Sequence, residues 1–195
     1  MKNIKNKSIG FIYNSSIPET RVFIKNLIRN LGYSDENTWI TSLDKLSSFK
    51  DTFSETYLFI IAGGDGSILK TVRSIYNYSI PILGINFGKI GFMTELDPND
   101  ALEKLPEYIN GKVRIEERMM LEASIFLSNN DKPRLTINAL NDVVIGHGGV
   151  TKLSDIEVSV DDNVLTIYRS DAVVVSTATG STGYAYSAGG PILHP

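Results

Sequence analysis

The stretch from Tyr57 to Asn86 limits the possible fold more than any other part of the sequence. It opens with Tyr57–Ala62, an almost wholly apolar run, as expected for a strand of a parallel sheet covered on both faces. A glycine-rich loop follows, and then a helical pattern for which Ser67 is a suitable cap. The apolar run Ile80–Asn86 completes a sequence of strand, loop, helix and strand, which predicts a βαβ unit. The side chains expected on the inner face of the helix are Leu69, Val72, Ile75 and Tyr76.

The same alternation of strands and helices extends over the N-terminal half of the chain. Ser8–Tyr13 is predicted to be a first strand, and a helix should begin near Pro18 and stop at Gly32. A further helix is expected soon after Asp97. Together these elements predict a Rossmann-like α/β domain with a mostly parallel sheet and the glycine loop, which we place at residues 1–97.

Alternating and β-branched runs replace the helical patterns in the second half. Asp161 to Asn163 offers a hairpin turn inside one of these runs. We therefore expect a second, mainly β domain at residues 98–195. Its predicted strand regions are Val113–Leu127, Leu135–Ile145, Ile156–Ile167 and Ala172–Ser176.

The composition and the net charge of the chain argue against binding to nucleic acid or membranes and against secretion. The 195 residues carry a net charge of -3, so no general attraction to nucleic acid or to an anionic membrane is expected. No apolar run is long enough to span a bilayer or to serve as a secretion signal. The chain has no cysteine, which permits a reducing compartment, and we expect the cytoplasm.

The loop GGDGS places a carboxylate where a phosphate would be expected. Glycines before a helix expose backbone N–H groups at the positive end of the helix dipole, a suitable place for phosphate. Asp65 would repel a phosphate, unless a magnesium ion bridges the two or the carboxylate accepts a proton from a substrate hydroxyl. Both alternatives belong to phosphoryl transfer. The competing interpretation is a tight turn in which Asp65 only bonds nearby backbone N–H groups. The spacing fits neither a Walker A loop nor a dinucleotide fingerprint.

A second stretch rich in glycine and hydroxyl side chains lies at Ser176–Pro191, STATGSTGYAYSAGGP. So many small residues after a strand suit a backbone that a ligand approaches closely. Tyr184 offers a flat surface for stacking, although a turn-rich loop without a ligand would have a similar composition. The hydroxyl side chains available as donors are Thr179, Ser181, Thr182 and Ser187.

These two stretches resemble motifs of the NAD kinase family, which makes NADP by phosphorylating the adenosine ribose of NAD. GGDG alone is shared with phosphofructokinases and with diacylglycerol-type lipid kinases, whereas the C-terminal signature is highly specific. Five elements resemble family motifs in the family's order: GGDGS at Gly63–Ser67, NFGKIGF at Asn86–Phe92, EERMML at Glu116–Leu121, LNDVVI at Leu140–Ile145, and the signature at Ser170–Pro195.

The resemblance implies a role for each matching side chain. Asp65 would accept a hydrogen bond, and then the proton, from the 2′-hydroxyl of the adenosine ribose. Asn141 and Asp142 would hold the acceptor ribose or groups near the phosphates, and Asp171 would reach the nicotinamide end. Phe92 would line the adenine pocket. The alternative for the two later aspartates is that they are solvated acids in turns.

Three residues of the C-terminal signature, Thr182, Tyr184 and Ser187, would contact a nucleoside portion of the substrate. For Tyr184 and Phe92 the alternative is a place in the hydrophobic core. The remaining positions expected to contact substrate are Gly63, Gly64, Gly66, Ser67, Asn86 and Gly183.

The chain departs from the family pattern at a few positions. Asp142 replaces a usual Glu and is one methylene shorter, Gly183 replaces a common Ala, and Ser67 replaces a common Thr. The sequence stops at Pro195, where family members continue through further strands, so we expect the β domain to be an incomplete β-sandwich.

The resemblance also implies what the protein works with. NAD is the expected substrate, and ATP or polyphosphate is the expected phosphoryl donor. Mg²⁺ or another divalent cation should bind together with the donor. The full-length form should be a homo-oligomer, a dimer or a tetramer. We expect no metal site made of protein side chains. Two rival functions remain: a dinucleotide-binding fragment without turnover, and a lipid or sugar kinase that shares the GGDG loop.

Overall fold

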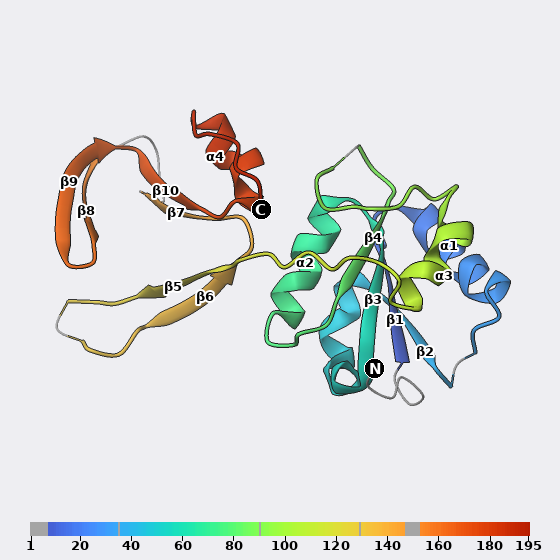
Figure 1. Cartoon of the computed structure of the whole chain (residues 1–195). Coiled ribbons are helices and arrows are strands. Elements are labelled where there is room, and N and C mark those ends of the chain that lie inside the picture. Colours follow the sequence, from blue (N-terminus) through green and yellow to red (C-terminus); the bar gives the residue numbers. More distant parts are fainter. Residues whose placement is uncertain (1–7, 35, 90, 129, 147–152) are drawn as a thin grey trace. The chain divides into compact units, whose positions relative to one another are not determined.

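The computed structural model describes residues 8–34, 36–89, 91–128, 130–146 and 153–195, and the chain forms two compact units. Unit 1 is Met1–Glu116 and unit 2 is Glu117–Pro195. Unit 1 contains a sheet flanked by helices, and unit 2 contains mostly antiparallel strands (Figure 1). The predicted combination of an α/β part followed by a mainly β part is confirmed.

The sheet of unit 1 has four parallel strands in the order β2-β1-β3-β4. The strands predicted around the glycine loop and at the start of the chain are present, with ends that differ by up to two residues. The edge strand β2 was not predicted, because it is short and three of its five residues carry hydroxyl groups that give no apolar pattern. The strand bounds are β1 Ser8–Tyr13, β2 Thr38–Ser42, β3 Thr56–Gly63 and β4 Ile82–Asn86.

Helices cover both faces of this sheet. One face packs against α1 (Pro18–Asn30) and α3 (Ala101–Ile109), and the other packs against α2 (Asp65–Ile75) and a 3₁₀ segment, η2 (Leu43–Glu55). Gly32, just after α1, has φ +72°, a conformation that glycine adopts without strain and that ends a helix. The core between the first face and its helices is mostly apolar: its most buried members include Phe11, Ile24, Ile60, Ile85 and Leu105.

The helix after the glycine loop differs from the prediction in its N-cap and in part of its buried face. It begins at Asp65 with Gly64 as the N-cap, so Ser67 is not the cap. Ser67 lies instead in the first turn, 3% exposed, and its Oγ accepts a hydrogen bond from the Asn14 side chain at 3.1 Å. On the expected inner face Val72 and Ile75 are buried as predicted, but Ile68 is buried as well and Tyr76 is 45% exposed.

The boundary between the units lies after Glu116, whereas the sequence pattern places it at residue 97. Helix α3 explains the difference. Ala101 and Leu105 are fully buried in the core of unit 1, so this helix is part of the α/β layer structure.

Unit 2 consists of three two-stranded antiparallel sheets in the described residues: β5-β6, β7-β10 and β8-β9. The predicted hairpin joins β8 to β9, and Asp161 and Asp162 both have positive φ, as a two-residue hairpin loop of type I′ requires. Among the described residues of unit 2, no large apolar side chain is buried. The strand bounds are β5 Leu121–Ile125, β6 Leu135–Ala139, β7 Asp142–Gly146, β8 Ser154–Val160, β9 Asn163–Ser170 and β10 Ala172–Ser176.

A half-buried tyrosine at the start of β3 should make the stability of unit 1 decrease at alkaline pH. Burial, with a smaller contribution from Tyr33, raises the pKa of Tyr57 from 10.0 to about 12. Because the folded state favours the neutral phenol, the free energy of unfolding should fall as pH rises from 10 to 12. Urea unfolding at pH 9, 10 and 11 measures this slope. Tyr57→Phe should show a shallower slope, and identical slopes would contradict the assignment.

Candidate functional site

The glycine loop lies at the carboxyl end of β3, which is where ligands bind in open parallel sheets. Gly63 must lack a side chain, because an added Cβ would lie 2.6 Å from the Cβ of Ser67 and nearer still to its hydroxyl. Gly64 and Gly66, in contrast, face open space. In the first turn of α2 the Ser67 N–H donates to the Gly64 carbonyl at 2.8 Å. The N–H groups of Asp65 and Gly66 precede the hydrogen bonds of the helix and are the ones available to an anion.

Asp65 is held by the backbone of a second loop. Its Oδ2 accepts a hydrogen bond from the Phe92 N–H at 2.8 Å, and its Oδ1 accepts one from the Met93 N–H at 3.1 Å. A carboxylate offers about four acceptor positions, so roughly two remain for a ligand. The carboxylate therefore bonds backbone N–H groups and also has the capacity to accept from a hydroxyl; the two interpretations of this residue are compatible.

The loop after β4 is tied to the same strands. Phe87 N–H donates to the Gly63 carbonyl at 3.1 Å, and the Asn86 side chain accepts from the Gly88 N–H at 3.1 Å. Asn86 thus shapes the loop in this structure. The Phe92 side chain is 70% exposed, which excludes a place in the core.

Asn141 organises the corresponding region of unit 2, between β6 and β7. Its carbonyl accepts from the Thr177 N–H at 2.8 Å and from the Thr177 hydroxyl at 3.1 Å. Gly180 packs against the same carbonyl so closely that an added Cβ would lie 2.6 Å from the Ser176 Oγ and nearer still to the carbonyl. The side-chain Oδ1 of Asn141 is buried and accepts no hydrogen bond from the described residues. Such an orphaned acceptor is uncommon in folded proteins and costs free energy.

The two acidic residues predicted in this unit lie at opposite ends of one small sheet. Asp142 begins β7 and pairs with Ser176, whereas Asp171 precedes β10 and its carbonyl lies against Gly146 at the other end of β7. Asp142 is half-buried and Asp171 is exposed. Five residues of strand put the two roughly 15 Å apart along the sheet. The structure does not bring them together.

The C-terminal signature folds into two short turns, η3 (Thr179–Thr182) and α4 (Tyr184–Ser187). The hydroxyls of Thr182 and Ser187 donate only weakly, to carbonyl oxygens at 3.3 and 3.4 Å. Gly183 joins the turns and is exposed, and the Tyr184 side chain is 55% exposed, so neither is core. An exposed ring beside small residues suits stacking on a flat ligand.

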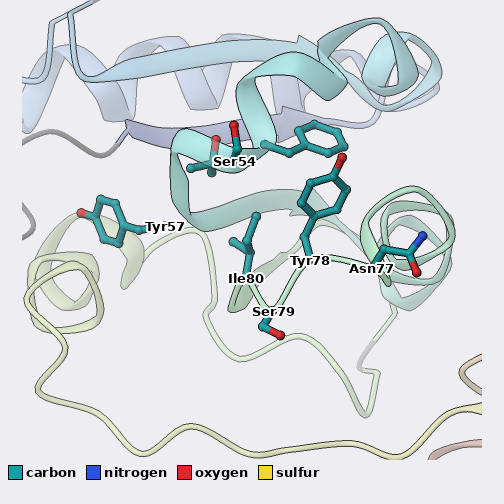
Figure 2. A pocket seen from close by; sticks show the side chains of 8 residues that line it. Ser54, Tyr57, Asn77, Tyr78, Ser79 and Ile80 are labelled. Atoms are coloured by element: carbon teal, nitrogen blue, oxygen red, sulfur yellow. The ribbon is translucent and has the colours of Figure 1, made fainter. Parts of the chain in front are cut away.

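A separate hollow of about 380 Å³ lies at the other end of β3 and β4. Figure 2 shows the side chains around it, among them Tyr57, Tyr78 and Ile80. Thr56 and Tyr57 begin β3 and Gly63 ends it, so the hollow is roughly 20 Å from the glycine loop. The hollow is therefore separate from the loop that carries Asp65.

The described part of the chain contains no group of three or more His, Cys, Asp or Glu side chains suited to hold a metal ion. His147 lies outside the described residues. Among the described helices, none is long and apolar enough to cross a membrane.

Comparison with known families identifies both units. The model of the ATP-NAD kinase N-terminal domain matches residues 19–113, and that of the ATP-NAD kinase C-terminal domain matches residues 140–195. The NAD kinase of Natranaerobius thermophilus is 36% identical over 195 residues, which cover 96% of this chain and 68% of that protein. The chain belongs to the NAD kinase family. An NAD kinase of Dehalococcoides mccartyi is 38% identical over 97% of this chain and 66% of its own length. The chain thus spans about two thirds of the length of these NAD kinases.

Two solved structures of NAD kinase relatives share the fold. Yeast NADH kinase, solved in complex with NADH, has a TM-score of 0.84 at 24% identity and covers 98% of this chain and 63% of its own. The NAD kinase of Archaeoglobus fulgidus, solved in complex with ATP, has a TM-score of 0.70 at 24% identity, covering 96% and 68%. At this identity the likeness establishes the fold.

Three features of this NAD kinase family site were not predicted from the sequence. They are the backbone contacts of Gly91 to Met93 with Asp65, the packing of Gly180 on Asn141, and the Arg118 side chain. Arg118 donates from Nη1 to the Thr179 Oγ1 at 3.3 Å, which connects the EERMML motif to the C-terminal signature. The motifs contained these residues, but only the folded chain shows which atoms meet.

Proposed function

We propose that this chain is an NAD kinase, transferring a phosphoryl group from ATP or polyphosphate to the adenosine ribose 2′-hydroxyl of NAD. The observation that carries the proposal is the Asp65 carboxylate, held by two backbone N–H groups at an anion-binding loop. Family membership and relatives solved with NADH and with ATP support it.

The transfer assigns one chemical role to Asp65. The ribose 2′-oxygen attacks the terminal phosphorus, its proton passes to the Asp65 carboxylate, and the bond from that phosphorus to the leaving oxygen breaks. The products are NADP and ADP, or a polyphosphate one unit shorter. A carboxylate within hydrogen-bond reach of the hydroxyl orients it and accepts its proton. Positioning and charge stabilisation supply the rest of the catalysis in such reactions.

A divalent cation, Mg²⁺ or another, would enter with the phosphoryl donor. Magnesium at nucleotide sites is commonly held by one or two carboxylates together with substrate phosphates, without an all-protein cage. This fits a chain whose described residues contain no cluster of metal-binding side chains. The ion would offset the negative charge of the donor phosphates close to Asp65.

In unit 2 a bound dinucleotide would supply a hydrogen-bond donor for the buried Oδ1 of Asn141. A ribose hydroxyl of the dinucleotide would donate to its Oδ1 and remove the cost of the buried unsatisfied atom. Asp142, next in sequence, would contact the same ribose, and Asp171 the nicotinamide end. Thr182 and Ser187 would accept or donate hydrogen bonds at a nucleoside portion.

Direct measurement of NADP formation tests the proposal. The purified chain is incubated with NAD and either Mg-ATP or Mg-polyphosphate, and NADP is detected with an NADP-specific dehydrogenase. NADP formation supports the proposal, and the two donors show which phosphate source is used. NAD binding without turnover would favour a non-catalytic dinucleotide-binding fragment, and phosphorylation of a lipid or sugar in place of NAD would favour the other rival.

We expect Tyr184 to contribute to binding through its exposed ring. Tyr184→Ala should raise the Kd for NAD by about tenfold, because a stacking contact contributes roughly 1 kcal/mol beyond its buried area. Tyr184→Phe should retain most of the affinity. Calorimetric titration with NAD measures both.

Tyr186→Ala is the matched control for this prediction. Tyr186 lies two positions later in the same short turn, is similarly exposed at 56%, and points away from the face of Tyr184. An equal loss for the two alanine variants, or no loss for Tyr184→Ala in a folded protein, would remove the stacking role.

We also propose that the protein forms a homo-oligomer through unit 2. Ile137, Ile145 and Val175 are on its small sheets with 43%, 46% and 47% of their surfaces exposed. Apolar strand surfaces of this kind favour association with another chain. Sedimentation velocity at several protein concentrations would reveal a dimer or tetramer, and a monomer at all concentrations would contradict this part.

A further inference from the structure

Gly91 lies directly against the Asp65 carboxylate. A Cβ added to Gly91 would lie 2.5 Å from Cγ of Asp65, 2.6 Å from its Oδ2, and nearer still to its Oδ1. Cβ atoms in real proteins essentially never approach another heavy atom within 3.0 Å. The space that a side chain of residue 91 would need is therefore filled by the carboxylate.

Backbone conformation does not explain the glycine. The described glycines with positive φ are Gly32, Gly111 and Gly189, and Gly91 is not among them. An alanine could therefore adopt the φ angle of residue 91 without the strain that a left-handed conformation imposes. The requirement is for space against Asp65.

The next two residues complete the contact. The N–H groups of Phe92 and Met93 donate to the two different oxygens of the carboxylate, at 2.8 and 3.1 Å. Two hydrogen bonds to separate oxygens fix both the position of the carboxylate and the rotation of its plane. With Gly91 against one side, the Asp65 side chain is enclosed by three consecutive residues.

This enclosing segment is itself attached to the sheet. On one side of it Phe87 N–H donates to the Gly63 carbonyl at 3.1 Å, and on the other Glu95 N–H donates to the Gly84 carbonyl at 2.9 Å. Gly63 ends the central strand β3, and Gly84 lies on the neighbouring edge strand β4. The orientation of the carboxylate is consequently tied to the sheet of unit 1.

We propose that Gly91 is a positioning residue for phosphoryl transfer. By lacking a side chain, it lets the N–H groups of Phe92 and Met93 reach Asp65 and hold the carboxylate toward the acceptor hydroxyl. This inference rests on the proposed kinase function for its effect on turnover. The contact itself can be tested without turnover.

The test compares Gly91→Ala with Gly88→Ala. The added methyl group of Gly91→Ala displaces the carboxylate, and displacement of a catalytic group by about 1 Å can cost on the order of 100-fold in rate. We expect kcat for NADP formation to fall about 10- to 100-fold, with KM for NAD changed less than about threefold, since binding groups are untouched. Gly88→Ala adds a methyl to the same loop, with its nearest neighbours at 3.9 and 4.0 Å. Its loss in kcat should be at least about ten times smaller.

Amide hydrogen exchange provides the measurement that does not need turnover. The N–H groups of Phe92 and Met93 should exchange more slowly in the wild type than in Asp65→Ala, and Gly91→Ala should lose the same protection. A merely structural role for Gly91 would raise KM and speed exchange throughout the loop.

The outcomes separate the inference from the proposed function. Absence of NADP formation by the wild type would remove the kinase proposal, and the exchange rates would still decide whether the contact exists. If Gly91→Ala does not fold, the exchange rates of the wild type and of Asp65→Ala still decide whether the N–H groups of Phe92 and Met93 contact Asp65. Wild-type kcat in Gly91→Ala, or equal exchange of the two amides in the wild type and Asp65→Ala, would overturn the inference.

Discussion

Replacing Asp65 by asparagine should lower kcat for NADP formation by about 100- to 10,000-fold, the usual cost of losing a general base. Asparagine keeps the shape of the side chain and one acceptor oxygen, but it cannot take the proton of the ribose hydroxyl at neutral pH. The Kd for NAD should change much less, because most contacts to the dinucleotide are expected in unit 2. Steady-state kinetics with Mg-ATP and calorimetric titration with NAD measure the two effects separately.

Asp65→Asn also changes the hydrogen bonds that residue 65 accepts from its neighbours. The N–H groups of Phe92 and Met93 donate to different oxygens of Asp65, and the NH₂ group that replaces one of these oxygens in asparagine cannot accept its hydrogen bond. Gly91→Ala is therefore a useful reference, because it displaces the carboxylate and leaves the base in place. A loss in Asp65→Asn no larger than in Gly91→Ala would indicate that orientation, and not proton acceptance, is the contribution of Asp65. Wild-type turnover in Asp65→Asn would exclude both roles.

Local sequence patterns were sufficient for the elements that depend on neighbouring residues. The run Tyr57–Ala62 is apolar at every position that the sheet buries from both sides, and it became the centre of β3. The turn at Asp161 and Asp162 needs two residues that tolerate positive φ, and aspartate is one of the few types that do. In both cases the physical cause lies within a few residues.

Features that depend on distant contacts were not readable from the sequence. The short strand β2 is stabilised by pairing with β1, about thirty residues earlier, and has little apolar pattern of its own. Helix α3 belongs to unit 1 because its apolar face packs against the core of that unit. The change from helical to strand-like sequence patterns does not reveal this contact. Gly91 lies 26 positions after Asp65, and only the folded loop shows that the two occupy the same space. The assigned roles of the binding residues remain predictions.

Hydrogen exchange should show a large difference in stability between the two units. Strands β1 and β3 are central in a four-stranded sheet, with Phe11 and Ile60 fully buried between layers. The strands of unit 2 form two-stranded sheets, and Ile137 and Leu165 on them are 43% and 63% exposed. A two-stranded sheet without a buried face is marginally stable in water. We expect protection factors at least about a hundredfold higher in β1 and β3 than in β5, β6, β8 and β9.

Within unit 2 the expected protection is graded, and this makes the prediction specific. Strands β7 and β10 adjoin the packed region in which Thr177 and Gly180 are buried against the Asn141 carbonyl, so their amides should exchange more slowly than those of the β8-β9 hairpin. The measurement needs a dilute sample shown to be monomeric, because association would cover the exposed apolar strands and slow their exchange. If β8 and β9 in such a sample were as protected as β3, the expected difference in stability between the two units would be wrong. Addition of NAD should slow exchange around Asn141 first, since ligand binding stabilises the state that binds it and the orphaned acceptor is there.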